Sequence, residues 1–289
     1  MELAKILAPI VADMAAVEKQ LGVVAGRIAA SDSELPKGGR SAPLGILHQI
    51  SRHPFAVPGK RLRPALVLLS SLAAGSARQS RVAAVGLATA VEVLHAASLV
   101  HDDIIDGAVE RRHQVSLNKR YGNRVAVLAG DILYTEFFSL ITELPVPEPI
   151  RFRLLSLFLG TTRKMCVGEI LAQEAEATSK GLGFAEYLEI SEDKTACLFS
   201  ACCEGGGIIG DSTDEGSRAL GEFGMLFGLT FQMLDDLADR DHSLDPKIDL
   251  RGRTEEYARR TRVAAAALGP SSAGVADLLD YVVAQALSP

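Results

Sequence analysis

Hydrophobic residues recur along this chain at intervals of three and four positions, which is the period of an amphipathic α-helix. Stretches that alternate hydrophobic and polar residues, as half-buried strands do, are lacking. The pattern therefore predicts an all-α fold with about eight or more helices. They are expected over residues 5–28, 64–74, 81–105, 123–142, 151–173, 184–209, 216–239 and 254–285.

Proline, glycine and serine gather at the breaks between these helices, where they favour turns. None of the breaks is long enough for a domain linker and no tandem repeat is present, so we expect one domain over residues 1–289. Gly205, Gly206 and Gly207 lie inside a helical pattern instead, so that either two helices pass very close there or the helix is kinked. The breaks are 31–43, 53–60, 145–149, 179–184, 210–216 and 269–274.

Composition supports one sizeable helical core. Hydrophobic residues make up 48% of the chain, while aromatic residues reach only 5% and tryptophan is absent, which favours helices over sheets. The net charge of −6 argues against a general nucleic-acid binder, because such proteins neutralise phosphates with a broad basic surface. Any basic site must therefore be local.

The longest apolar stretch, residues 82–100, is long enough to span a bilayer but holds Glu92, His95 and Ser98. We therefore expect a buried core helix and no integral membrane segment. The N-terminus is typical of an amphipathic helix rather than of a signal peptide. The four cysteines form no CxxC pair, so we expect small buried hydrophobic residues in a reducing compartment and a cytoplasmic location.

Two acidic clusters with the same spacing follow apolar helical segments, in "LVHDDIIDGAVERRH" (99–113) and "FQMLDDLADRD" (231–241). Carboxylates four residues apart share one face of a helix and repel each other, so a bound cation is expected. Carboxylates without neighbouring cysteine favour hard ions such as Mg²⁺, which also binds substrate phosphates. A solvated acidic helix end is the alternative for either cluster alone. The aspartates are Asp102, Asp103, Asp106, Asp235, Asp236 and Asp239.

Basic residues accompany these clusters. Arg111 and Arg112 follow the first one, and "GKRLRP" (59–64) contains Lys60, Arg61 and Arg63. Arginine presents a fork that matches phosphate oxygens, whereas lysine acts as a point charge. Acidic and basic groups in one site would suit a polyanion bridged by metal ions, although "GKRLRP" alone could be an ordinary basic surface turn.

In order along the chain, "GKRLRP", "VEVLHAASLVHDDIIDGAVERR", "GNRVAVLAGDILYTEFF", "GEI", "YLEISEDKTACLF" and "FGLTFQMLDDLAD" resemble the trans-isoprenyl diphosphate synthases, the polyprenyl synthetase family. The resemblance covers most of residues 55 to 241. It implies a single bundle of antiparallel helices around a central cavity, with the two aspartate motifs facing each other and holding three Mg²⁺ ions on an allylic diphosphate. It also implies a homodimer.

The same resemblance assigns roles to individual residues. The principal metal ligands would be Asp102, Asp106 and Asp235, supported by Asp103, Asp236 and Asp239. The allylic diphosphate would be held by Arg111, Lys194 and Lys247. Isopentenyl diphosphate would be held by Lys60, Arg63, His95 and Arg112. Thr195 and Gln232 match positions near the developing carbocation. His95 could instead be a satisfied core histidine, and Lys194 could simply end a polar helix face.

The implied reaction is the Mg²⁺-dependent condensation of isopentenyl diphosphate with an allylic diphosphate. Breaking the allylic C–O bond leaves a diphosphate and a carbocation, so cationic groups assist departure and no covalent nucleophile is needed. Ala97 and Ser98 lie one turn before Asp102, where short-chain family members often carry a bulky aromatic residue. Small residues there suggest an open tunnel and a medium or long product, although close helix packing would also explain them. A deeper floor could be built by Val91, Leu94, Tyr134, Phe137 and Phe138.

The segment after the second cluster departs from the family pattern. "DPKIDLRGRTEEYARR" (245–260) offers only partial matches, and the C-terminal segment after about 245 is shortened. Lys247 is therefore a partial match to its family position, and a regulatory or weakly active subunit of a two-chain synthase is the alternative function. Gly107 and His113 stand where Asp and Gly are commoner in the family.

Three other enzyme or metal-protein classes fit less of the sequence. A class I terpene cyclase would normally mix Asn, Ser or Thr with Glu in its second metal motif. An HD-type phosphohydrolase is suggested by His101–Asp102 with His53 and His95, but it leaves the second cluster unexplained. A di-iron bundle needs two Glu-x-x-His motifs, and only Glu92–His95 is present.

Overall fold

The structure is a computed structural model that describes residues 2–30, 46–57, 59–75, 78–177, 181–239 and 244–287. Its regular elements are almost entirely helical, which confirms the all-α prediction. A single short hairpin among the described residues pairs β1 (Glu110–Arg111) with β2 (Gln114–Val115). The helices are α1 (Leu3–Leu7), α2 (Val11–Ala30), α3 (Ile46–Arg52), α4 (Leu62–Ala73), α5 (Arg78–Ile105), α6 (Leu117–Tyr121), α7 (Asn123–Thr142), α8 (Glu148–Ala177), α9 (Phe184–Ser191), α10 (Cys197–Ile209), α11 (Asp214–Asp239), α12 (Leu250–Ala267) and α13 (Ala273–Leu287).

Two of the predicted helices are interrupted where no break was predicted, so their predicted continuity was wrong, whereas the range 254–285 is interrupted at the predicted break 269–274. Pro9 lies in a 3₁₀ turn between α1 and α2, since proline has no N–H to donate within a helix. A π-helical turn, Glu192–Ala196, separates α9 from α10. Gly269 has φ +87° and ends α12 directly before Pro270. The predicted break at 31–43 lies entirely outside the described residues.

Contacts between Cα atoms divide the chain into two compact units. One unit comprises Met1–Val11, Ala65–Ala84 and Pro145–Pro289. The other comprises Ala12–Pro64 and Val85–Leu144. We call them the C-terminal unit and the N-terminal unit. The single-domain expectation stays a prediction.

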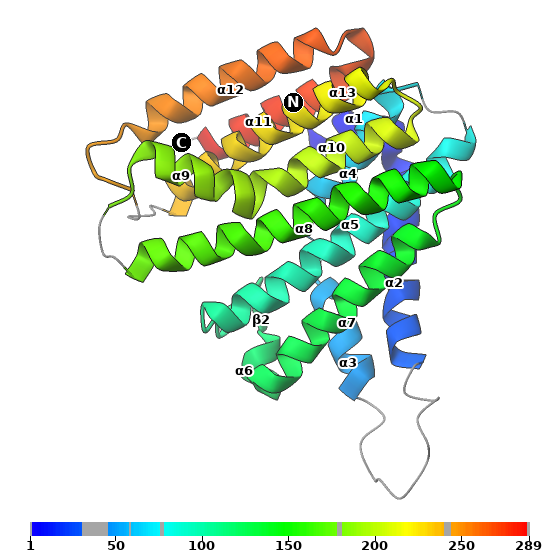
Figure 1. Cartoon of the computed structure of the whole chain (residues 1–289), viewed down its shortest axis with the longest axis vertical. Helices are drawn as coiled ribbons and strands as arrows, with labels where there is room; N and C mark the ends of the chain where they lie inside the picture. Colours follow the sequence, from blue (N-terminus) through cyan, green and yellow to red (C-terminus); the bar gives the residue numbers. More distant parts are fainter. Residues whose placement is uncertain are drawn as a thin grey trace, which may run out of the picture. The chain divides into compact units, whose positions relative to one another are not determined.

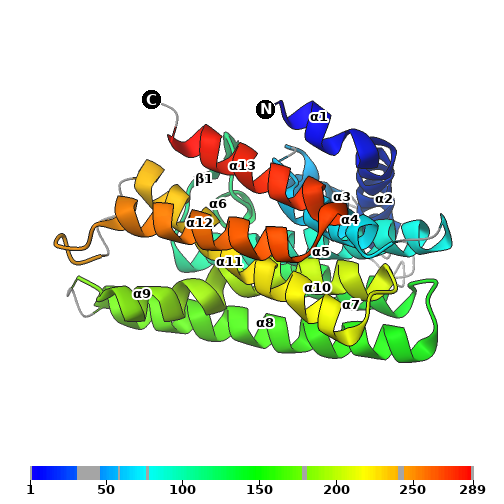
Figure 2. The same ribbon diagram turned by 90° about the horizontal axis from the view of Figure 1, so that it is seen from above.

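In the C-terminal unit, α12, α11, α10 and α8 lie side by side in that order (Figure 1). The helix α13 packs against α12 and against α1, as Figure 2 shows from above. A Cβ atom on Gly206 of α10 would collide with the Val67 carbonyl oxygen, and one on Gly224 of α11 would lie 2.6 Å from the Phe199 carbonyl oxygen. Close helix passage therefore accounts for Gly206 of α10 and for Gly224 of α11.

In the N-terminal unit, side chains on α5 connect to α2. Thr89 Oγ1 donates to Gln20 Oε1 at 2.9 Å. The buried Arg61 guanidinium binds Glu18 of α2 at 2.7 Å and also binds the buried Glu92 of α5. Arg27 near the end of α2 binds Glu136 and Glu143. The two ion pairs of Arg61 hold the "GKRLRP" segment between α2 and α5.

Two helices are long and apolar enough to cross a membrane by length and composition alone, Ser80–Ile105 and Asn123–Thr142. In the first, 72% of the apolar window is buried inside the protein, which confirms a core helix over residues 82–100. In the second the buried share is 33%. A buried core helix passes the same test as a membrane span, so these lengths alone do not indicate a membrane protein.

Cys197, Cys202 and Cys203 are buried, and burial raises the pKa of the Cys203 thiol to about 12. Cys166 is exposed, so the prediction of a buried residue was wrong there. It lies next to the exposed Val167 on the outward side of α8, where hydrophobic neighbours in sequence do not enclose it.

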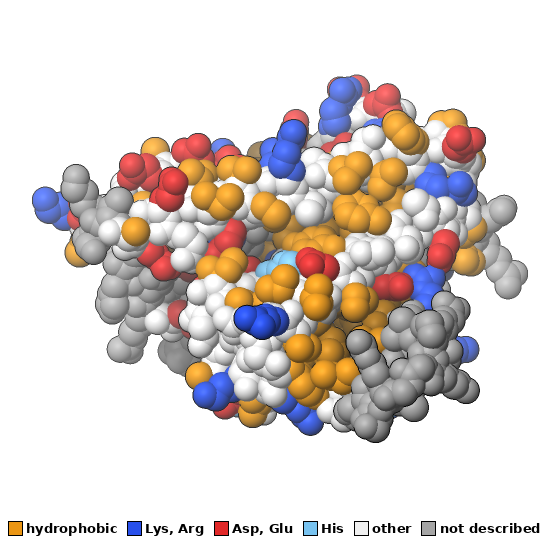
Figure 3. All heavy atoms as spheres, turned by 60° about the horizontal axis from the view of Figure 1, so that its bottom comes forward, with side chains coloured by type: hydrophobic (Ala, Val, Ile, Leu, Met, Phe, Trp, Pro, Cys, Tyr) orange, Lys and Arg blue, Asp and Glu red, His pale blue; other side chains and the backbone are white. Residues whose placement is uncertain are grey.

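Hydrophobic side chains also reach the protein surface, and Figure 3 shows groups of them among charged residues on the face it views. Four exposed residues on α8 share one side of that helix because of their spacing. We call them the α8 stripe. They are Phe152, Leu159, Val167 and Ile170.

Candidate active site

The second acidic cluster occupies the last turns of α11, in the C-terminal unit. Asp235 and Asp239 are exposed, whereas Asp236 retains only 9% of its accessible surface. The Tyr187 hydroxyl donates to Asp236 Oδ2 at 2.5 Å, and Gln232 Nε2 donates to Asp236 Oδ1 at 2.8 Å. Burial of Asp236 is therefore compensated by hydrogen bonds from within the protein.

The π-helical turn places Lys194 and Thr195 beside this end of α11. Thr195 Oγ1 donates to Gln232 Oε1 at 2.8 Å, and Lys194 Nζ lies 2.8 Å from Glu169 Oε2 on α8. Gly168 lets the α8 backbone approach the Lys194 backbone so closely that a Cβ would not fit. Single π-turns are frequent at functional sites, where they reposition side chains. The structure thus brings together three residues that the resemblance implied: Lys194, Thr195 and Gln232.

The first acidic cluster ends α5, in the N-terminal unit. Asp106 is exposed, Asp102 is partly buried and Asp103 is 5% exposed. Arg111 Nε donates to Asp103 Oδ1 at 2.5 Å. Burial raises the pKa of Asp103, while the charge of Arg111 opposes this effect. Asp103 and Arg111, predicted to bind a metal ion and a diphosphate, are therefore bound to each other here.

The hairpin β1–β2 presents both arginines on a tight turn. Arg112 and His113 have φ of 51° and 63°, the left-handed values that a two-residue type I′ hairpin requires at both central positions. Glycine adopts this conformation at less cost than other residues. His53 Nε2 binds the Val115 carbonyl oxygen at 2.7 Å, and the Asn118 amide donates to the Asp103 and Ala108 carbonyl oxygens. These contacts hold the hairpin against the end of α5.

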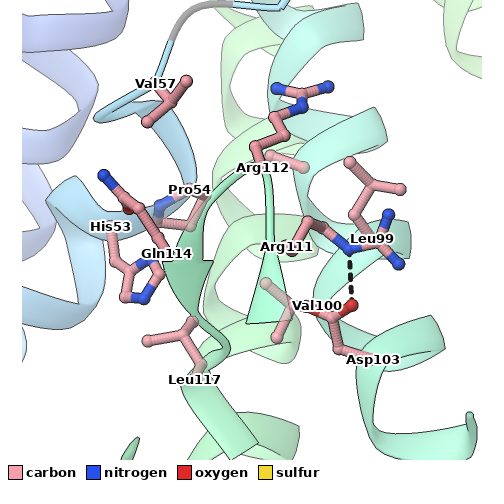
Figure 4. A pocket seen from close by; sticks show the side chains of 11 residues that line it. His53, Pro54, Val57, Leu99, Val100, Asp103, Arg111, Arg112, Gln114 and Leu117 are labelled. Atoms are coloured by element: carbon pink, nitrogen blue, oxygen red, sulfur yellow. Dashed lines mark hydrogen bonds and ion pairs between the residues drawn. The ribbon is translucent and has the colours of Figure 1, made fainter. Parts of the chain in front are cut away.

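A pocket opens beside the hairpin (Figure 4). Arg111 and Arg112 reach it from β1 and the turn, and the dashed line marks the Arg111–Asp103 pair. Apolar side chains of α5 and α6 complete the walls, so charged groups and a hydrophobic surface meet in one cavity. It is lined by His53, Pro54, Val57, Ala96, Leu99, Val100, Asp103, Arg111, Arg112, Gln114 and Leu117.

The "GKRLRP" segment contributes to the same region. The Arg112 guanidinium lies against Gly59, since a Cβ there would be 2.9 Å from Arg112 Nη2. Arg63 Nη1 lies 3.1 Å from His95 Nε2. Burial lowers the pKa of His95 well below its usual range, and Arg63, Arg112, Arg111 and Arg61 lower it further, so the ring is neutral and accepts from Arg63. Lys60 is exposed, whereas Arg61 is buried and forms an ion pair with Glu18.

Ala97 is fully buried and Ser98 is partly buried, with its hydroxyl donating to the His95 carbonyl oxygen at 2.9 Å. Val91, Leu94 and Phe137 are buried as well. Burial of Ala97 agrees with close helix packing and with a tunnel wall.

The donor set fits Mg²⁺ in its chemistry, because the six aspartates provide hard carboxylate oxygens. Asp103 binds Arg111, and Asp236 accepts hydrogen bonds from Tyr187 and Gln232. Within the parts of the chain that the structure describes, no three carboxylate, histidine or cysteine side chains already converge as a metal cluster.

Lys247 is exposed in the turn before α12, where its backbone N–H donates to Asp245 Oδ1. The Asp245 N–H donates to the Leu182 carbonyl oxygen, and Asp249 caps α12. The segment after the second cluster is thereby tied to the start of α9. Residues 240–243 lie outside the described part of the chain.

The polyprenyl synthetase profile matches residues 45–245, more than half of the chain. The chain belongs to the polyprenyl synthetase family. A curated relative, geranylgeranyl diphosphate synthase from Methanosarcina mazei, is 38% identical over 194 residues, which cover 67% of this chain and 58% of that protein. Octaprenyl diphosphate synthase from Escherichia coli is 30% identical over 194 residues, covering 67% and 57%. The chain thus spans less than two thirds of the length of these synthases.

Solved structures of family members match the fold over nearly their whole length. Decaprenyl diphosphate synthase from Rhodobacter capsulatus has a TM-score of 0.78 and 25% identity, covering 98% of both chains. Polyprenyl synthase from Caulobacter crescentus, solved with calcium and isoprenyl diphosphate, has a TM-score of 0.77 and 25% identity, covering 98% of this chain and 97% of that one. The expected isoprenoid synthase type of fold is confirmed.

Sequence reasoning gave no role to Tyr187 and Gln114, noted Glu169 only within "GEI", and considered His53 only as a ligand of a phosphohydrolase. Tyr187 lies inside a motif quoted for the resemblance, but its partner Asp236 is far along the chain, so spacing gave no signal.

The phosphohydrolase and di-iron interpretations lose support from the contacts. His101 Nε2 binds the Val127 carbonyl oxygen at 3.1 Å, and Glu92 binds Arg61.

The depressed pKa of His95 predicts a loss of stability in acid. The unfolded chain takes up a proton as the pH falls below about 6.5, whereas the folded protein does not. This contribution is complete above that pH and is lost as the pH falls toward the folded pKa. The unfolding free energy of the wild type, relative to His95→Gln, should fall by about 1 kcal/mol or more between pH 7.5 and 5.5.

Chemical denaturation at the two pH values measures this difference. The exposed His48 provides the matched control. His48→Gln should show the same fall in unfolding free energy between pH 7.5 and 5.5 as the wild type. Equal pH dependence of the wild type and His95→Gln would show that folding does not lower the pKa of His95.

The left-handed backbone at His113 predicts a gain in stability from His113→Gly. The substitution removes a conformational cost of about 1 kcal/mol, part of which is offset by the greater entropy of glycine in the unfolded chain. We expect an increase of about 0.5 kcal/mol in the unfolding free energy. His113→Ala keeps the cost and should give no increase, so an equal gain from alanine would assign the effect to the imidazole ring instead.

Proposed function

We propose that this protein is a trans-polyprenyl diphosphate synthase that condenses isopentenyl diphosphate with an allylic diphosphate. The observation that carries the proposal is the pocket of Figure 4. The charged side chains of Arg111, Arg112 and Asp103 line it together with apolar side chains such as Ala96 and Leu99. Such a site suits a diphosphate attached to a hydrocarbon. The synthases named among its relatives support the same reaction class.

Mg²⁺, when bound, would neutralise the allylic diphosphate and favour its departure. Asp102, Asp106 and Asp235 would hold the ions, with Asp103, Asp236 and Asp239 in support, and we expect three ions. Arg111, Lys194 and Lys247 would bind the allylic diphosphate. Lys60, Arg63, His95 and Arg112 would bind isopentenyl diphosphate, for which a neutral His95 avoids an additional buried charge beside Arg63.

The reaction breaks the allylic C–O bond and forms a C–C bond from the double bond of isopentenyl diphosphate, after which a proton leaves to the departing diphosphate. Gln232 Oε1 and Thr195 Oγ1 would face the developing carbocation. Both oxygens carry a partial negative charge that would stabilise it. The apolar walls of the pocket would exclude water, which otherwise captures the cation.

We further propose that Ala97 and Ser98 leave room for a growing chain, so that the product is medium or long. A cytoplasmic location stays a prediction. The partner subunit would be a second copy of this chain, because the α8 stripe exposes four hydrophobic residues on one side of a helix.

Turnover with both diphosphates and Mg²⁺, followed by chromatography of the products, tests the enzyme proposal. Asp102→Asn and Asp235→Asn should each lower kcat by about 100-fold or more, because each removes a carboxylate charge from the proposed metal site. Asp214, at the start of α11, binds Arg153 away from the site, so Asp214→Asn is the matched control and should retain activity.

The products distinguish the competing functions. Chains of about thirty carbons or more would support the tunnel, whereas fifteen carbons would refute it. Cyclic hydrocarbon would indicate a terpene cyclase. Turnover only with an added partner chain would indicate a subunit of a two-chain synthase, and no turnover in either condition would contradict the proposal.

The oligomeric state can be measured by sedimentation equilibrium. Leu159→Lys and Phe152→Glu place charges in the α8 stripe and should convert a dimer into monomers, because burying an unpaired charge in an interface is costly. Val263 is an exposed hydrophobic residue on α12, outside the stripe, so Val263→Lys should leave the dimer intact. A monomeric wild type would contradict the proposed partner.

A further inference from the structure

A chain of hydrogen bonds links three elements of the C-terminal unit. The Tyr187 hydroxyl on α9 donates to Asp236 Oδ2, and Gln232 Nε2 donates to Asp236 Oδ1, with Gln232 and Asp236 both on α11. Thr195 Oγ1 in the π-helical turn donates to Gln232 Oε1. The distances are 2.5, 2.8 and 2.8 Å, so each contact is a well-formed hydrogen bond.

The donor and acceptor roles in this series of hydrogen bonds determine which end of the Gln232 amide faces Thr195. An ionised carboxylate only accepts hydrogen bonds, so Asp236 binds the NH₂ end of the amide and the carbonyl end points the other way. The Thr195 hydroxyl can donate to that carbonyl oxygen. A flipped amide would direct its NH₂ group toward Thr195 and its oxygen toward the Asp236 carboxylate, which would repel it.

Tyr187 is well placed to hold Asp236 in one orientation. Its side chain is 4% exposed and packs in a cluster with Ala196, Leu229 and Met233. Its ring also stacks on Phe184, with 6.1 Å between centroids. A tyrosine fixed in this way offers its hydroxyl at one position, so that the carboxylate it binds loses rotational freedom.

We propose that Tyr187 is a positioning residue that acts through Asp236 to fix the orientation of the Gln232 amide. The proposal rests on the proposed prenyl transfer, in which Gln232 Oε1 and Thr195 Oγ1 face the developing carbocation. Dipoles that are oriented before the reaction stabilise charge without reorganising, so the orientation matters most in the transition state. Loss of the Tyr187 hydroxyl should therefore lower kcat more than it raises KM.

A double-mutant cycle between Tyr187→Phe and Gln232→Leu tests this role. Tyr187→Phe should lower kcat about 10-fold while changing the KM of each diphosphate by less than about threefold. In the Gln232→Leu background, the same change should lower kcat by less than about twofold, because the amide it orients is already absent. Equal losses in both backgrounds would show that Tyr187 does not act through the Gln232 amide and would overturn the proposal.

The matched control is Tyr257, the other buried tyrosine of the same hydrophobic cluster. Tyr257→Phe also removes one hydroxyl group and should retain kcat within about twofold. Thermal unfolding of both variants separates a loss of folded protein from a loss of orientation. A fall in kcat for Tyr257→Phe equal to that for Tyr187→Phe would also overturn the proposal.

A second measurement does not depend on turnover. In protein labelled with ¹⁵N-glutamine, the side-chain NH₂ signals of Gln232 are assigned by their absence in Gln232→Leu. Tyr187→Phe should shift these signals and speed their hydrogen exchange, whereas Tyr257→Phe should leave them unchanged. Unchanged signals in Tyr187→Phe would overturn the proposed orientation, whether or not the wild type is active. If the wild type lacks activity but the signals shift, the prenyl transfer proposal fails and the positioning contact stands.

Discussion

Repulsion between neighbouring carboxylates is the constraint on which this structure depends. Each acidic cluster places aspartates one turn apart at the end of an apolar helix, where water is partly excluded and the repulsion is stronger than on an open surface. The protein offsets part of this cost itself. Asp103 binds Arg111, and Asp236 accepts hydrogen bonds from Tyr187 and Gln232. The more exposed carboxylates remain oriented toward one face of each helix, where divalent cations would neutralise them.

The backbone departs from regular geometry at the positions that display the remaining charged groups. A π-helical turn carries Lys194 and Thr195, and a hairpin turn with two left-handed residues carries Arg112 and His113. Strained or irregular backbone persists only where the surrounding contacts hold it. Here those contacts come from Glu169 to Lys194, from His53 to Val115 and from Asn118 to the end of α5. In each unit, contacts from neighbouring residues therefore hold the irregular backbone that carries the charged side chains.

Basic residues that are adjacent in sequence serve different purposes in the N-terminal unit. Arg61 is buried between Glu18 and Glu92 and holds the segment between α2 and α5. Lys60 is exposed, and Arg63 donates to the neutral ring of His95. A short basic motif thus anchors itself through Arg61, while its flanking residues belong to the proposed site for an anionic ligand.

The sequence by itself determined the helical class, the positions of the long helices and the two acidic clusters, because periodicity and i, i+4 spacing are local properties of the chain. The glycine and proline at 269–270 also marked the break after α12, whereas the interruption at Pro9 was not predicted although the proline is visible in the sequence. Only the tertiary structure decided that Arg61 belongs to the fold, that Cys166 is exposed and that Tyr187 binds Asp236. Those outcomes depend on which distant segments pack together, and contacts between distant segments leave no period in the sequence.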